Sequence, residues 1–172
     1  TIQNEKINED INIAIISDLH DNQIGEDNKK LIDKINLLSP DIILVVGDVV
    51  NKDSKNSEII ISLMKKLCKD YTVFYSLGNT DIDYIKNGTS DLINDLENTG
   101  VVFLNNQYKD IKIKGNTIRI GGMYEYAFGF DDTKDKERKE TYNFLVKFQD
   151  TDNYKIMMAH RPDSFIFWDA SK

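Results

Sequence analysis

The chain has 172 residues, 40% of them hydrophobic and 30% charged, which is typical of a single globular domain. Its formal net charge of −7 disfavours nucleic acid binding through a broad basic patch. No stretch has the apolar length of a transmembrane helix and no signal-peptide pattern is present, so we expect a cytoplasmic or membrane-associated protein, with any membrane association not visible in this chain.

The first hundred residues alternate between short apolar runs and amphipathic segments. The runs predict strands over residues 11–17, 41–46 and 71–77, each rich in Ile, Val or Tyr and stopped by polar residues or Gly. Apolar residues at helical spacing predict helices over about 28–38, 57–68 and 90–98, with Ser57 as N-cap of the second. Strands about 30 residues apart with helices between them are typical of parallel strand–helix–strand units.

The rhythm then changes. A short strand is predicted over 101–104, and strands over 108–114 and 117–121 flank Gly115–Asn116, a two-residue turn suited to a hairpin. The aromatic segment 121–130 is expected to form a loop near the site. A charged helix over about 133–148, a strand over 154–159 and the start of a helix over 164–170 follow. This order predicts an α/β sandwich with mixed sheet pairing, in one domain over residues 1–172.

Polar side chains directly follow four of the predicted strands. Asp18 and His20 follow the first, Asp48 the second, Asn79 the third and His160 the last. The carboxyl ends of parallel strands share one edge of a sheet, where open α/β sheets bind their ligands. Carboxylates, imidazoles and an amide gathered there suit divalent metal ions.

The spacing of these residues predicts two ions. Asp18 and His20, at i and i+2 of an extended backbone, can reach one ion, and the two oxygens of Asp48 can bridge two. The Asn79 amide oxygen and the His160 imidazole add ligands to the second ion. Two ions roughly 3.5–4 Å apart can bind a phosphate oxygen and lower the pKa of a bridging water to about 7.

Four motifs in chain order carry a family resemblance: Asp18-Leu19-His20, Gly47-Asp48, Gly78-Asn79-Thr80-Asp81 and His160. Together they resemble the motif set of calcineurin-like metallophosphoesterases. The stretches SDLHDNQIG, SPDIILVVGDVV and AHRPDSF look like the bacterial branch of membrane-associated phosphohydrolases. The resemblance runs from Ile11 to the C-terminus and implies a four-layer αββα sandwich of two mixed β-sheets flanked by helices.

The resemblance also implies an activity and a ligand set. Asp18, His20 and Asp48 would hold one ion, and Asp48, Asn79 and His160 the other, with Mn, Fe or Zn as the metals. The implied reaction is hydrolysis of a phosphodiester, pyrophosphate or phosphomonoester bond, in a small-molecule or lipid-like substrate, by a metal-activated hydroxide. Among these bonds, diesters and pyrophosphates are favoured, because Thr80 offers little help to a poor leaving group.

Two departures from the family pattern leave an alternative open. The resemblance implies Asp48, Asn79 and Thr80 as catalytic residues, but Thr80 stands where the family usually has a general-acid His. The family also expects a further strand ending in Gly-His-x-His, whereas both histidines of this chain are already assigned. We therefore expect a chain truncated at its C-terminus, with reduced metal affinity. The alternative is a non-catalytic scaffold or binding protein on the same fold, with a vacant or single-metal site.

Simpler interpretations apply to single residues. Asn79 alone is as typical of a helix cap or turn as of a metal ligand. Asp81 is interpreted as a cap or a solvated loop charge, with orientation of its neighbours as a second role. A doubly wound nucleotide-binding domain ranks last, because no Gly-rich phosphate loop follows any strand. The sequence leaves the oligomeric state open.

Overall fold

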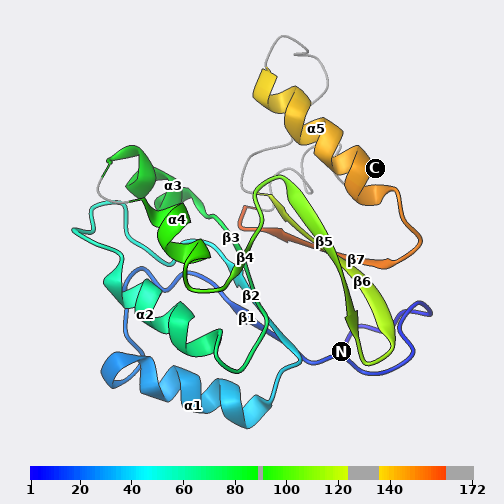
Figure 1. Ribbon diagram of the computed structural model, residues 1–172, viewed down its shortest axis with the longest axis horizontal. Helices are drawn as coiled ribbons and strands as arrows, with labels where there is room; N and C mark the ends of the chain where they lie inside the picture. Colours follow the sequence, from blue (N-terminus) through cyan, green and yellow to red (C-terminus); the bar gives the residue numbers. More distant parts are fainter. Residues whose placement is uncertain (89–90, 124–135, 162–172) are drawn as a thin grey trace.

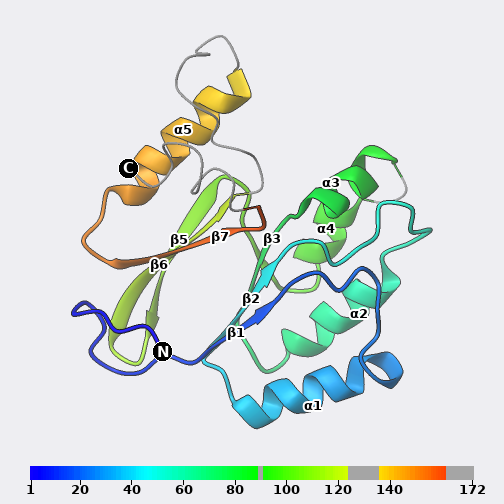
Figure 2. The same cartoon turned by 180° about the vertical axis from the view of Figure 1, so that it is seen from behind.

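The computed structural model describes residues 1–88, 91–123 and 136–161. They form four layers, in the order helices, sheet, sheet, helix (Figure 1). The view from behind shows the same separation, with α5 on the far side of the second sheet from the first (Figure 2). This confirms the predicted α/β fold of two sheets flanked by helices; a single domain over 1–172 stays a prediction.

The first sheet carries the loops of the site. Its strands are β1 (Ile13–Ile16), β2 (Ile42–Val46), β3 (Val73–Ser76) and β4 (Val102–Phe103), and they pair in parallel in that order. The connections hold the 3₁₀ turn η1 (Glu26–Asn28) and the helices α1 (Lys29–Leu38), α2 (Glu58–Leu67), α3 (Asn79–Lys86) and α4 (Leu92–Glu97). Parallel pairing places the carboxyl ends of β1, β2 and β3 at one edge.

The second sheet is mixed. Strands β5 (Gln107–Ile113) and β6 (Asn116–Met123) form an antiparallel hairpin, and β7 (Tyr154–Ala159) pairs with β6 in parallel. Helix α5 (Lys136–Gln149) packs on this sheet through Phe144, Leu145 and Phe148.

Side-chain alternation along β2 explains the layering. Ile43 and Val45 face the helices, where they join a core that includes Ile60, Leu63 and Met64 of α2. The alternate positions face the second sheet, in a core whose buried members are Ile42, Leu44, Phe74, Leu104, Ile118, Ile120 and Met158. A strand that is apolar on both faces is what an interior parallel strand requires.

The structure corrects several local predictions. The hairpin turns at Lys114–Gly115, both with positive φ as a type I′ turn requires, while Asn116 already begins β6. Residues 122 and 123, expected in a loop, extend β6, and the rest of that loop lies outside the described residues, as does the helix predicted over 164–170. Ser57 precedes α2, but its side chain makes no capping hydrogen bond.

Helix α3 was not predicted. It begins at Asn79, shortly after β3, where Asp81 was interpreted as a cap or a solvated loop charge. Its signal is a set of apolar residues at helical spacing, Ile82, Ile85 and the fully buried Tyr84. Within the described ranges, none of the helices is both long and apolar enough to cross a bilayer.

Candidate metal centre

The loops after β1 and β2 run side by side at the carboxyl edge of the first sheet. The backbone N–H of Asp18 donates to Gly47 O at 3.2 Å, that of His20 to Asp48 O at 3.1 Å, and that of Asp21 to Val49 O at 2.9 Å. These bonds continue the pairing of the two strands into their loops, so the side chains of one loop keep a fixed distance from those of the other.

Three of the predicted ligands have left-handed backbone conformations. The φ angles are 57° at Asp18, 47° at His20 and 54° at Asp48. Such conformations cost about 1 kcal/mol or more at each L-residue and concentrate at functional sites. The interloop hydrogen bonds offset that cost. The left-handed conformations let the neighbouring loops after β1 and β2 direct the side chains of Asp18, His20 and Asp48 toward one another.

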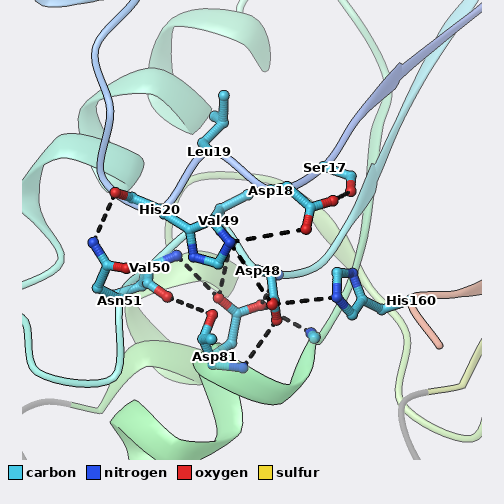
Figure 3. A network of polar contacts seen from close by, with 12 residues as sticks. Ser17, Asp18, Leu19, His20, Asp48, Val49, Val50, Asn51, Asp81 and His160 are labelled. Carbon is cyan, nitrogen blue, oxygen red and sulfur yellow. Dashed lines mark hydrogen bonds and ion pairs between the residues drawn. The ribbon is translucent and has the colours of Figure 1, made fainter.

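Asp18, His20 and Asp48 form a cluster with metal-binding potential (Figure 3). One ligand atom from each lies within 4.8 Å of the other two. The Nε2 atom of His20 is 3.8 Å from Asp18 Oδ1 and 4.0 Å from Asp48 Oδ2. Two atoms each about 2.0–2.2 Å from one ion lie no more than about 4.4 Å apart, so these two distances fit a shared ion.

His160 reaches the same carboxylate from the second sheet. It follows β7, and its Nε2 lies 3.2 Å from Asp48 Oδ2 (Figure 3). Its Nδ1 lies 2.8 Å from the backbone carbonyl oxygen of Val46. A carbonyl oxygen only accepts hydrogen bonds, so Nδ1 donates this one, and Nε2 is the nitrogen that faces Asp48. Metal-binding histidines commonly have their second nitrogen fixed in this way.

Asp48 is the centre of the arrangement. Its side chain is 6% exposed, and its Oδ1 accepts the backbone N–H of Thr80 at 2.9 Å. That N–H belongs to the first turn of α3, where unpaired N–H groups favour a negative charge. The bond to Oδ1 leaves Oδ2 facing the two histidines.

Two glycines allow the loops after β2 and β3 to touch. A Cβ on Gly47 would lie 2.2 Å from Gly78 N, and a Cβ on Gly78 would lie 2.2 Å from Asp48 Oδ1. Gly47 also has a φ of +69°. Any side chain at either position would therefore separate Asp48 from the start of α3.

Asn79 and Thr80 stand apart from the cluster. Asn79 is the first residue of α3 and is exposed. The Thr80 hydroxyl donates to the carbonyl of Val50 at 2.8 Å, so its hydrogen is already used. The structure thus brings Asp18, His20, Asp48 and His160 together, whereas the Asn79 ligand assignment and the Thr80 catalytic assignment stay predictions.

Asp81 is buried, which corrects its interpretation as a solvated charge. Its exposed fraction is 0%, and its carboxylate accepts backbone N–H groups from both the β2 and β3 loops. Burial raises the pKa of Asp81, and the N–H groups of Gly78 and Val50 oppose that rise. Its bond from the N–H of Gly78, the N-cap residue of α3, supports the interpretation as a cap, and its bonds from the β2 loop support the second role considered for it, orientation of its neighbours.

An open pocket of about 430 Å³ adjoins the cluster and was not predicted. It is lined by His20, Asn51, Lys52, Asp53, Ser54 and Thr80. Its wall is held by Asp21, whose carboxylate accepts the backbone N–H of Asn51 at 2.9 Å and the hydroxyl of Ser54. The signal in the sequence was the polar run after Asp48, which resembles an ordinary loop.

Comparison with known proteins agrees with this geometry. The family model described as calcineurin-like phosphoesterase matches residues 11–171. A protein of Campylobacter jejuni, named uncharacterized metallophosphoesterase Cj0846, is 28% identical over 167 residues, which cover 96% of this chain. The chain spans only 42% of the length of that relative.

Two solved structures overlap with the chain more loosely. The protein of unknown function AQ665 from Aquifex aeolicus is 16% identical, with a TM-score of 0.37, covering 86% of this chain and 89% of that one. Another is 12% identical, with a TM-score of 0.48, covering 84% and 67%. The assignment does not depend on these scores. On the match over residues 11–171, this chain belongs to the calcineurin-like phosphoesterase family.

Proposed function

We propose that this chain carries the metal centre of a dinuclear metal-dependent phosphoesterase that cleaves phosphodiester or pyrophosphate bonds. The observation that carries this proposal is the position of Asp48 Oδ2, which lies 4.0 Å from His20 Nε2 and 3.2 Å from His160 Nε2. A carboxylate placed between two imidazoles suits a bridge between two ions better than it suits a surface charge.

The donor set fits divalent ions. Asp18, His20 and Asp48 would hold the first, and Asp48, His160 and Asn79 would hold the second. Carboxylate, imidazole and amide donors suit Mn, Fe and Zn ions. When bound, such ions coordinate phosphoryl oxygens and acidify a water, which supplies the nucleophile for attack at phosphorus.

The remaining work falls to the chain's own residues. The Thr80 N–H and the Val46 carbonyl orient Asp48 and His160 before any ligand arrives. The Thr80 hydroxyl cannot give up a proton at neutral pH, so the leaving group must depart without a general acid at this position. This favours leaving groups of low pKa and supports diesters or pyrophosphates over monoesters.

The open pocket is the proposed seat for the rest of the substrate. His20 is common to the pocket and the metal cluster, and Lys52 supplies a cation on the pocket wall. A phosphate ester bound at the cluster would extend toward Lys52, which attracts negative charge. Replacing Lys52 with Gln should raise KM severalfold with little change in kcat.

A second candidate is a binding scaffold with a vacant or single-metal site. The exposure of Asn79 and the engaged hydroxyl of Thr80 favour it, because neither side chain contributes to the cluster. A scaffold without metal would not require the contact between His160 Nδ1 and Val46 O, which fixes the His160 ring beside Asp48.

Elemental analysis of the purified chain decides between the two, with Asp48→Asn alongside and Asp110→Asn as a control outside the site. The proposal expects two ions per chain, lost in Asp48→Asn and kept in Asp110→Asn, together with hydrolysis of bis(p-nitrophenyl) phosphate. A single ion that survives Asp48→Asn, with no hydrolysis, would establish the scaffold instead.

A further inference from the structure

We propose that Asp81 is a positioning residue that holds the loops after β2 and β3 at the separation that metal binding needs. The inference builds on the proposed function, because the two loops carry Asp48 and Asn79. It assigns Asp81 a task that differs from ligation and from catalysis.

One side chain spans both loops. Asp81 Oδ2 accepts the N–H of Asp48 at 3.0 Å and that of Gly78 at 2.9 Å (Figure 3 shows Asp81 beneath Asp48). Its Oδ1 accepts the N–H groups of Val49 and Val50, each at 3.1 Å. A single oxygen therefore joins the residue that would bridge the ions to the residue that precedes Asn79.

These bonds also use up the carboxylate. The Tyr75 hydroxyl adds a fifth donor, 3.4 Å from Oδ2, and none of the side chain is exposed. A carboxylate has about four acceptor sites, so little capacity remains for a metal ion. Asp81 also lies outside the cluster of Asp18, His20 and Asp48. It acts on the ligands through their backbone.

The backbone N–H groups of the two loops need the Asp81 carboxylate as their hydrogen-bond acceptor. Four neighbouring N–H groups point inward, and a buried donor that loses its partner is destabilising. Asn in place of Asp81 would keep the shape but turn an NH₂ group toward two of these donors. The loop after β2 would move, and Asp48, with its left-handed backbone, would move with it.

The matched control is Asp110→Asn. Asp110 also accepts charge-assisted hydrogen bonds, from Arg119 at 2.8 and 2.9 Å, but it lies on β5, away from the ligand loops. Its loss lowers stability without touching the loops. Comparison with Asp81→Asn therefore separates positioning from a general loss of stability.

The first measurement is hydrogen exchange of the metal-free chain at the amides of Asp48, Val49, Val50 and Gly78. We expect slow exchange in the wild type and in Asp110→Asn, and exchange faster by at least tenfold in Asp81→Asn. Fast exchange at these amides in the wild type would overturn the proposal, even where Asp81→Asn does not fold.

The second measurement is the affinity for Mn²⁺. We expect Asp81→Asn to bind Mn²⁺ at least tenfold more weakly than Asp110→Asn, at a temperature where both are folded. Equal affinities would overturn the inference. Asp48→Asn distinguishes the two proposals, because it should lose Mn²⁺ while keeping slow exchange. A wild type that binds no Mn²⁺ would defeat the proposed function and leave the exchange result to judge Asp81.

Discussion

Asp81 in the first sheet's helical layer and Arg119 in the second sheet use the same device with opposite charge. The Asp81 carboxylate gathers four backbone N–H groups. The Arg119 guanidinium gathers three backbone carbonyls at the end of α5, those of Lys147, Phe148 and Asp150. Arg119 also lies 4.0 Å from the centre of the Tyr108 ring.

The difference lies in what each charge holds. Arg119 fixes the end of a regular helix, which needs cations near its last carbonyls. Asp81 fixes two loops, one of which carries the left-handed residues Gly47 and Asp48. One charge thus serves stability and the other serves the geometry of a site. Substitutions at the site loops should therefore change both stability and metal affinity, whereas substitution of Arg119 should change stability alone.

The largest effect is expected at the contact between the site loops. Gly78→Ala would place a methyl group 2.2 Å from Asp48 Oδ1 and 2.4 Å from Asp48 N. Forcing these groups apart should cost about 3 kcal/mol of unfolding free energy and reduce Mn²⁺ affinity at least tenfold. Gly88→Ala is the control, since φ is +68° there but a Cβ would meet no described atom within 4 Å. Urea unfolding and Mn²⁺ titration of both variants check this.

Arg119→Met should produce the next largest effect, on stability alone. It removes the pair with Asp110 and three carbonyl contacts, for an expected loss of about 2–3 kcal/mol. Mn²⁺ affinity of the folded variant should match the wild type. A tenfold fall in that affinity would show that the two regions are coupled, and it would contradict the claim that Arg119 affects stability alone.

Lowering the pH should show how much the ionised Asp110 carboxylate, paired with Arg119, contributes to stability. The hydrogen bond from Arg119 holds the pKa of Asp110 below its usual range. Because the pKa of Asp110 is lower in the folded state, its carboxylate stabilises the folded state fully above the unfolded-state pKa of about 3.9. This stabilisation is lost as the pH falls through the folded-state pKa. The stability difference between wild type and Asp110→Asn should be constant above about pH 5 and shrink below about pH 4. A difference that stays constant to pH 2 would contradict this.

The smallest effect is expected at an exposed counterpart of Asp81. Asp91 caps α4 with a single acceptor bond, from Asn94 N at 3.4 Å. Asp91→Ala should cost about 1 kcal/mol, because water replaces the lost partner at an exposed helix end. Thermal unfolding measures it. A loss as large as that of Asp81→Asn would mean that burial and the number of donors do not matter.

Much of the fold followed from periodicity. Continuous apolar runs marked β1, β2 and β3, and the spacing of Leu and Ile marked α1 and α2. Burial on both faces imposes such a run on β2 and β3, and burial of one face imposes such a spacing on the helices. Helix α3 was not predicted, because its first turn lies within the polar motif Gly78-Asn79-Thr80-Asp81. The hairpin turn shifted by one residue, because positive φ fell on Lys114 rather than on Asn116.

Part of the site was likewise predicted from the sequence, and part was not. Asp18, His20, Asp48 and His160 were predicted from their places at strand ends, and the structure brings them together. The role of Asp81 was harder to infer, because a sequence shows residue types and not how many N–H groups converge on one oxygen. The pocket beside His20 depends on the path of a loop, which local patterns do not determine.

The bond between His160 Nδ1 and Val46 O joins residues 114 positions apart. During synthesis, Asp18, His20 and Asp48 emerge early, whereas the imidazole that faces the other side of Asp48 becomes available only after β7 pairs with β6. Long-range contacts of this kind form slowly. If the site holds two ions as proposed, acquisition of the second would be tied to the docking of β7, and a chain that captures metal during synthesis would fill its two positions in a fixed order.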